Sequence, residues 1–66
     1  MKVWINGEPA ETKGAANVAE LADRLGLAPN SILIEYNATA LHQREWPQHA
    51  LAEGDRIEFI RVVAGG

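Results

Sequence analysis

The chain has 66 residues, no cysteine and a formal net charge of −3, so it is long enough for one small domain that has neither a disulfide nor a thiolate metal site. Its six lysine and arginine residues are scattered, which argues against a nucleic-acid partner, because such a surface needs a basic stripe. No apolar run approaches the roughly 18 residues of a membrane span, and no signal peptide precedes Val3, so we expect a cytoplasmic protein without a membrane partner.

A β-hairpin is predicted at the start of the chain. Residues 2–6 are rich in β-branched and aromatic side chains, which are typical of a strand. Asn6-Gly7 favours a type I′ turn, because both residues tolerate a positive φ. The return strand covers residues 8–12. Pro9 within it has no N–H to donate, so this strand should lie at an edge of the sheet.

Trp4 is predicted on the opposite side of the sheet from its neighbours. Val3 and Ile5 share one face by the two-residue period of a strand, and this face should carry the core. Trp4 then covers the far side of the sheet or pairs with Ile60. The alternative is an exposed docking patch for a partner protein.

A single amphipathic helix follows. Asn17 can cap its first turn, and Glu20 stands three residues later, as in a capping box. Gly26 is placed to end the helix in a left-handed conformation, after which Leu27 returns to the core. The stripe expected to be buried consists of Val18, Leu21, Ala22 and Leu25.

Two further strands complete the predicted sheet. Residues 32–37 form the most apolar segment, which indicates a central strand covered on at least one face. Residues 56–62 form the last strand, after a turn at residues 53–55. A hairpin, one long helix and further strands predict an α+β fold, with a mixed sheet and the helix packed across one face. We expect one domain over residues 1–66, with a flexible C-terminal tail.

The segment between these strands, residues 38–52, has an irregular pattern. Residues 43–47 are compatible with one turn of helix that Pro47 limits, and Trp46 and Leu51 should anchor the segment to the core. His42 and His49 lie on either side of Trp46-Pro47, so no helical spacing joins them, and we predict no metal site.

The end of the sequence carries the candidate reactive group. Gly65-Gly66 follows the last strand closely, and the terminal carboxylate of Gly66 has an expected pKa of about 3.3–3.7, so it is ionised at neutral pH. Two residues without Cβ atoms can enter a narrow channel in a partner enzyme. Val62 and Val63, with Ala64 and Gly65, would dock along the partner's groove in an extended conformation. The alternative is an inert end or an expression scar.

The order of the elements resembles the β-grasp, or ubiquitin-like, fold. Residues 55–66, the Asn-Gly hairpin, and residues 37–41 leading to Trp46 resemble the sulfur carrier proteins of bacterial thiamine biosynthesis. The resemblance covers the whole chain, and Gly65-Gly66 is its most specific element. Members of this family often have Pro-Arg where this chain has His42-Gln43, so no role is carried over to Arg44.

The resemblance implies a protein substrate rather than an enzyme. The Gly66 carboxylate would be adenylated by a ubiquitin-activating-type adenylyltransferase, and a persulfide from a sulfur donor protein would convert it to a thiocarboxylate. That thiocarboxylate would supply sulfur to thiazole synthase. ATP and magnesium would be bound by the adenylyltransferase, and this chain would bind no cofactor.

Two other functions remain open at this stage. One is the small subunit of molybdopterin synthase or another β-grasp sulfur carrier, which shares the fold and the Gly-Gly end. The other is a ubiquitin-like interaction module without chemistry at its terminus.

Overall fold

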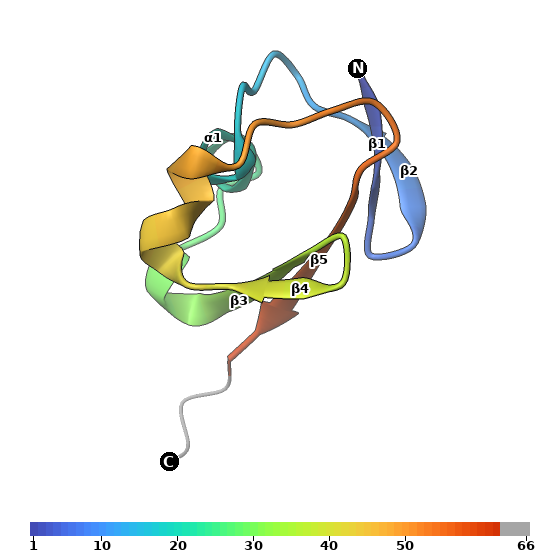
Figure 1. Ribbon diagram of the computed structural model, residues 1–66. Coiled ribbons are helices and arrows are strands. Elements are labelled where there is room, and N and C mark those ends of the chain that lie inside the picture. The colour runs from blue at the N-terminus through green and yellow to red at the C-terminus, as the bar shows by residue number, and fades with distance from the viewer. Residues whose placement is uncertain (63–66) are drawn as a thin grey trace.

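The computed structural model describes residues 1–62, and within them five strands form one mixed sheet in the order β2-β1-β5-β3-β4 (Figure 1). β1 and β5 are parallel, and the other neighbouring strands are antiparallel. The predicted α+β fold, with a mixed sheet and one helix across a face, is confirmed. No helix among residues 1–62 is long and apolar enough to cross a membrane. The strands are β1 (Lys2–Ile5), β2 (Glu8–Glu11), β3 (Ile32–Tyr36), β4 (Thr39–Leu41) and β5 (Arg56–Arg61).

The opening hairpin has the predicted turn. Asn6 and Gly7 have φ values of 50° and 82°, both positive as a type I′ turn requires. β2 is an edge strand, so the missing N–H of Pro9 costs no hydrogen bond to a further strand. Both predictions are confirmed.

The helix α1 (Val18–Arg24) is capped at both ends. The side chain of Asn17 accepts a hydrogen bond from Glu20 N at 2.9 Å. The Glu20 carboxylate accepts one from Ala16 N at 3.0 Å, so the reciprocal bond falls one residue earlier than a capping box predicts. At the other end Gly26 has φ 73°, and the N–H groups of Gly26 and Leu27 donate to Asp23 O and Ala22 O, as in a Schellman motif.

The prediction that Leu25 belongs to the buried stripe is wrong. Its relative exposure is 37%, while Leu21 is fully buried. The helix ends at Arg24, and Leu25 is the capping residue beyond it. The chain then reverses at Gly26, and Leu27 packs against the core instead.

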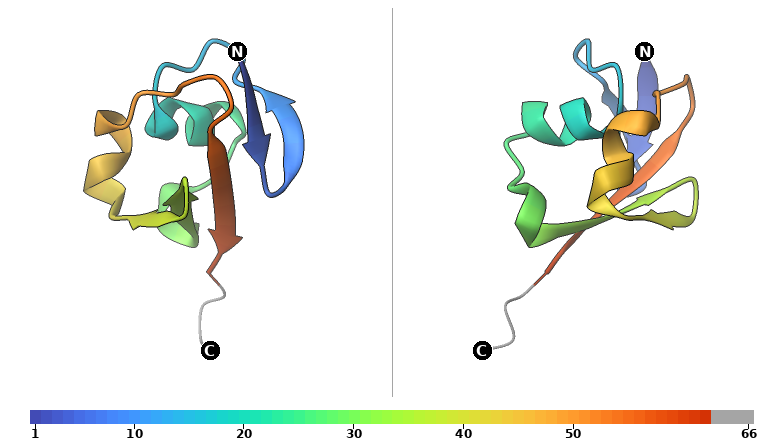
Figure 2. Two further views of the ribbon diagram at one scale, coloured as in Figure 1. Left: turned by 45° about the vertical axis from the view of Figure 1, so that its right-hand side comes forward. Right: turned by 60° about the vertical axis from the view of Figure 1, so that its left-hand side comes forward.

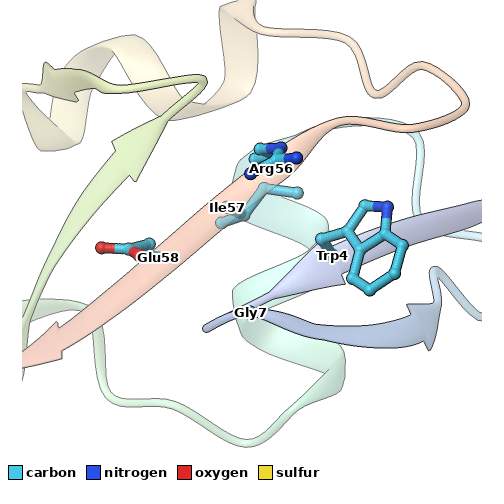
Figure 3. Close-up of a pocket in the computed structure, with 5 residues that line it drawn as sticks. All are labelled: Trp4, Gly7, Arg56, Ile57 and Glu58. Atoms are coloured by element: carbon cyan, nitrogen blue, oxygen red, sulfur yellow. The ribbon is translucent and has the colours of Figure 1, made fainter.

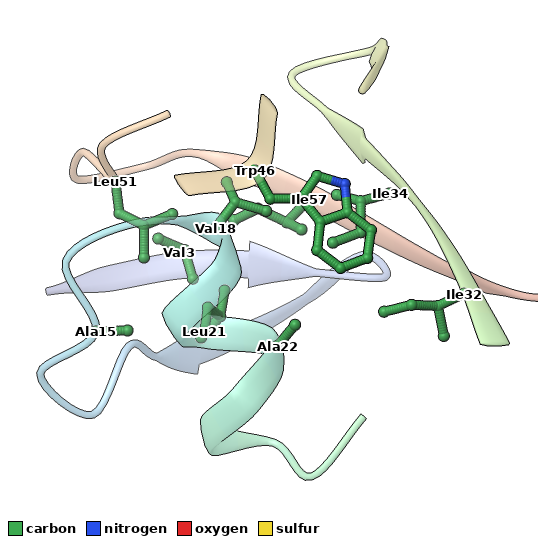
Figure 4. Close-up of a cluster of buried hydrophobic side chains, with 10 residues drawn as sticks. All are labelled: Val3, Ala15, Val18, Leu21, Ala22, Ile32, Ile34, Trp46, Leu51 and Ile57. Atoms are coloured by element: carbon green, nitrogen blue, oxygen red, sulfur yellow. The ribbon is translucent and has the colours of Figure 1, made fainter. Parts of the chain in front are cut away.

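The core lies between the sheet and the two helical segments α1 and η2 (Gln43–Gln48), which lie on the same side of the sheet (Figure 2). Trp46 fills the centre of this layer at 3% exposure, and Leu51 closes one end (Figure 4), so both are confirmed as anchors. The buried apolar side chains are Val3, Ala15, Val18, Leu21, Ala22, Ile32, Ile34, Trp46, Leu51 and Ile57.

The segment 38–52 is more regular than predicted. It contains β4, a three-residue edge strand that pairs with β3, and η2, a 3₁₀-helix in place of a single turn. β4 was missed because the turn before it has no glycine: Asn37 and Ala38 take positive φ values of 49° and 72°. A short 3₁₀-helix, η1 (Pro29–Ser31), also precedes β3.

β3 pairs with a strand on each side, as its apolar sequence predicts, although β5 is the middle strand of the sheet. Alternate residues of β3 point to opposite faces, so Ile32 and Ile34 are buried while Leu33 is 57% exposed. Trp4 lies on the same outer face as Leu33, as predicted. The pairing of Trp4 with Ile60 is wrong, because Trp4 stands opposite Arg56 of β5.

Candidate functional site

The last described residue, Val62, marks where the chain leaves the sheet. β5 pairs with β1 on one side and β3 on the other, and Val62 N still donates to Ser31 O at 2.8 Å. These hydrogen bonds fix the backbone of β5 and of Val62, so they also fix the point at which the chain leaves the sheet. The side chain of Val62 is 45% exposed. The other predicted site residues, Val63, Ala64, Gly65 and Gly66, lie outside the described residues.

A groove of about 400 Å³ opens beside this exit point. Val62 lines it together with the buried side chains of Ile32 and Trp46 and with Leu41 of β4. Trp46 Nε1 is buried and has no hydrogen-bond partner among the residues of the described range. Such a donor costs free energy in the folded state. The groove therefore has an apolar part, formed by Ile32, Leu41, Trp46 and Val62, next to the start of the tail.

Asp55 fixes the other end of β5. Its carboxylate accepts hydrogen bonds from the Tyr36 hydroxyl at 2.6 Å, from Ala52 N at 2.8 Å and from Asn37 Nδ2 at 3.2 Å. Tyr36 also has Ala50 O within 3.0 Å as a second acceptor. Asp55 is only 8% exposed, and its three donors compensate for the burial of its charge.

These hydrogen bonds change the pKa values of both side chains. Burial alone would raise the pKa of Asp55, but the hydrogen bonds from Tyr36, Ala52 and Asn37 outweigh it and hold this pKa below its ordinary value. Burial, together with the hydrogen bond and the negative charge of Asp55, raises the pKa of Tyr36 to about 12. Asp55 is therefore ionised and Tyr36 neutral throughout the physiological range.

The same cluster ties three strands together. Asn37 Oδ1 accepts from Arg56 N at 2.8 Å, and Asn37 N donates to Arg56 O at 2.7 Å. The backbone carbonyl of Asp55 accepts from Trp4 N at 2.8 Å. β5 is thus anchored to β1 and to the end of β3 where it begins. The sequence predicted only a turn at residues 53–55. The available signal was an aspartate directly before a strand, where a carboxylate often bonds to nearby backbone N–H groups.

The two histidines lie at opposite ends of η2. His42 precedes its first residue, where its backbone N donates to the Glu45 carboxylate at 2.7 Å. The ring of His49 follows its last residue and meets the ring of Tyr36 edge-on, with centroids 5.2 Å apart. Among residues 1–62 no group of three or more His, Cys, Asp or Glu side chains could hold a metal ion.

A second hollow, of about 200 Å³, lies on the outer face of the sheet beside Trp4 (Figure 3). Gly7, Arg56 and Glu58 line it, and the Lys2 ammonium lies 5.6 Å from the centroid of the Trp4 ring. The ammonium is within the range of a cation–π contact. Trp4 is 37% exposed, so part of its ring is available to another molecule.

A mixed five-stranded sheet with one helix across a face, and a middle strand that runs toward a Gly-Gly sequence, defines a β-grasp protein of the ubiquitin-like class. The crystal structure of the thiamine biosynthesis protein ThiS from Geobacter metallireducens has the same fold, with a TM-score of 0.84, 30% sequence identity and full coverage of both chains. Residues 3–66 match the ThiS family, and the chain belongs to this family of sulfur carrier proteins of thiamine biosynthesis.

Two relatives extend this result. The sulfur carrier protein ThiS of Thermus thermophilus is 30% identical over 64 residues, which are 97% of this chain and 98% of the relative. A protein of Magnetococcus marinus named thiazole synthase is 30% identical over all 66 residues, and the chain spans a fifth of that relative's length. The predicted family and β-grasp fold are confirmed. The members of this family are carrier proteins rather than enzymes, as the resemblance implied.

Proposed function

We propose that the C-terminal carboxylate of Gly66 is the group that carries sulfur. The match to the ThiS family carries this proposal, because it extends to residue 66 and so includes the Gly65-Gly66 end. We also propose that residues 1–66 act as one domain whose last residues are presented to partner enzymes. The exposed side chain of Val62, at the exit from the sheet, supports this arrangement.

The chemistry begins with a poor acyl donor. A carboxylate oxygen of Gly66 attacks the α-phosphorus of ATP in a ubiquitin-activating-type adenylyltransferase, and pyrophosphate leaves. The terminal sulfur of a protein persulfide then attacks the acyl carbon of the adenylate and AMP leaves. A second thiol cleaves the sulfur–sulfur bond, so that a thiocarboxylate remains on Gly66. One difficult substitution is thereby divided into easier ones. ATP and magnesium belong to the adenylyltransferase.

The thiocarboxylate then supplies sulfur to thiazole synthase. The relative from Magnetococcus marinus supports this choice, because a carrier-like segment forms part of a chain named thiazole synthase. Val62, with Val63, Ala64 and Gly65, is the segment that we propose to lie in the partner's channel. The thiamine names of the relatives favour this pathway over molybdopterin synthesis.

The test is an intact-mass measurement after incubation with the cognate adenylyltransferase, ATP, magnesium and a persulfide donor. We expect a mass increase that corresponds to the replacement of one oxygen by sulfur. A variant lengthened by one alanine after Gly66 is the matched control, since it keeps the fold and moves the carboxylate. It should remain unconverted. Equal conversion of the lengthened chain would show that the Gly66 carboxylate is not the reacting group.

A further inference from the structure

The outer face of the sheet, on the side away from α1 and η2, exposes large apolar side chains. Leu33 of β3 and Ile60 of β5 stand directly opposite each other and are 57% and 41% exposed. Trp4 lies on β1 on the same face, opposite Arg56 of β5, and the 45% exposed Val62 directly follows β5. A pair of large apolar side chains exposed next to each other, such as Leu33 and Ile60, marks a contact surface for another molecule.

Two carboxylates lie within this apolar face. Glu35 of β3 and Glu58 of β5 are directly opposite each other in the antiparallel register, two residues along each strand from Leu33 and Ile60. Both point outward, because their neighbours Ile34 and Ile57 are buried on the inner face. Side chains opposite each other in this way have Cβ atoms about 4.5–5.5 Å apart, and like charges at this distance destabilise a sheet.

Nothing in the described range neutralises this pair directly. Neither Glu35 nor Glu58 takes part in an ion pair among residues 1–62. Arg56 is the nearest basic residue along β5 on this face, but it stands opposite Trp4 rather than opposite a carboxylate. Figure 3 shows the Glu58 carboxylate turned away from both Arg56 and Trp4. The free domain therefore carries an unfavourable charge pair at the centre of an exposed face.

The length of the tail limits the distance between Val62 and the active site of a partner enzyme. Gly66 lies four residues after Val62, and an extended chain of four residues spans at most about 14 Å. An enzyme whose active site receives Gly66 must therefore lie within that distance of Val62. Because Val62 adjoins the Leu33–Ile60 pair, such an enzyme is close enough to cover the outer face as well.

We propose that this face docks onto thiazole synthase, with a basic side chain of the synthase entering between Glu35 and Glu58 while Leu33 and Ile60 contact apolar residues around it. Arginine suits the position best, because its planar guanidinium can bond to two carboxylates at once. The inference rests on the proposed function, which supplies the synthase as partner. The Magnetococcus marinus relative, which unites a carrier-like segment and a synthase name in one chain, favours the synthase over the adenylyltransferase.

The test distinguishes docking from folding, because the same substitutions should raise the melting temperature of the domain and lower its affinity for the synthase. Replacing Glu35 and Glu58 by glutamine removes the repulsion, so the double variant should melt at a higher temperature than the original protein. It should also bind the cognate thiazole synthase about tenfold more weakly, because the partner's cation loses its acceptors. Calorimetry on the full chain and the purified synthase measures the affinity, which for the original protein should fall more steeply with salt.

Asp23→Asn is the matched control, since Asp23 is an exposed acid on α1, on the other side of the sheet. It removes one negative charge, half of the change in the double glutamine variant, and should leave the affinity unchanged. Glu58→Lys is the second variant: it places a cation opposite Glu35, and it should stabilise the domain while weakening binding further. Unchanged affinity in the glutamine variant, or a lower melting temperature, would overturn the proposal.

Conversion to the thiocarboxylate is measured in parallel. We expect it to be the same in the glutamine variant and the original protein. Impaired conversion together with normal synthase binding would assign the face to the adenylyltransferase and overturn the proposal. If the original protein is not converted at all, the proposed function fails, while the calorimetry still decides whether the synthase docks on this face.

Discussion

Asp55→Asn tests whether the buried carboxylate at the start of β5 stabilises the fold. Asparagine keeps the shape of the side chain but has one acceptor oxygen and no charge, whereas Asp55 accepts from Tyr36, Asn37 and Ala52. Hydrogen bonds to a charged group contribute about 1.5–3 kcal/mol each. The Tyr36 hydroxyl can turn to Ala50 O, which recovers part of this contribution. We expect the free energy of unfolding to fall by about 2 kcal/mol.

Thermal unfolding followed by circular dichroism, and urea unfolding followed by tryptophan fluorescence, measure this change. For a domain of this size, 2 kcal/mol corresponds to a fall in Tm of about 8–16 °C. Tyr36→Phe is the partner variant, and the double variant completes a thermodynamic cycle. Because the two groups are in direct contact, we expect a coupling free energy of about 1 kcal/mol or more. A cycle with no coupling would show that the 2.6 Å hydrogen bond contributes nothing to stability.

The pH dependence follows from the direction of the pKa shift. The pKa of Asp55 is lower in the folded protein than its ordinary value of 3.8, so folding favours the ionised form. The resulting stability is present above pH 3.8 and is lost as the pH falls through the folded-state pKa. The difference between the original protein and Asp55→Asn should therefore be largest near neutral pH and narrow in acid. A difference that stays constant into acid would refute the reasoning.

Two further predictions concern stability. Leu21→Ala, in the fully buried part of α1, should lower the free energy of unfolding by about 2–5 kcal/mol, whereas Leu25→Ala, at a 37% exposed position, should lower it by less than about 1 kcal/mol. Urea unfolding of the two variants side by side checks this, and equal losses would contradict the structure's placement of Leu25. Ala38→Gly should raise the free energy of unfolding by about 0.5 kcal/mol, because Ala38 has φ 72° and glycine adopts this conformation without strain. A measured decrease in Tm would mean that the entropy lost from the unfolded chain exceeds the relief of strain.

Local chemistry made several elements predictable from the sequence. Asn6-Gly7 has a strong preference for one turn type, and Asn17 and Gly26 each satisfy backbone groups at one end of a helix. Leu25 shows the limit of such reasoning. Its spacing fits the buried stripe, but the reversal at Gly26 brings Leu27 to the core instead. β4 was missed for a related reason: its turn relies on Ala38 at a positive φ, which the sequence does not signal.

The candidate site likewise has one part that could be predicted from the sequence and one that could not. Gly65-Gly66 could be proposed as the reactive end because a carboxylate and two residues without side chains are properties of the sequence itself. The cross-strand pairing of Glu35 with Glu58 could not be predicted, because it depends on the register between β3 and β5, and these two residues lie more than twenty positions apart in the sequence. A shift of the register by one residue would pair each glutamate with an apolar neighbour of the other. The repulsion, and the inference drawn from it, exists only in the folded chain.

The two ends of β5 differ in their surroundings. Asp55 anchors its start through side-chain hydrogen bonds to the end of β3, while Val62 lies beyond its last residue, where the tail begins. The six residues between them extend about 20 Å, and their hydrogen bonds run to β1 and β3 rather than along the strand. The Asp55 cluster therefore lies at the end of β5 opposite the end from which the chain continues toward the proposed sulfur-carrying residue.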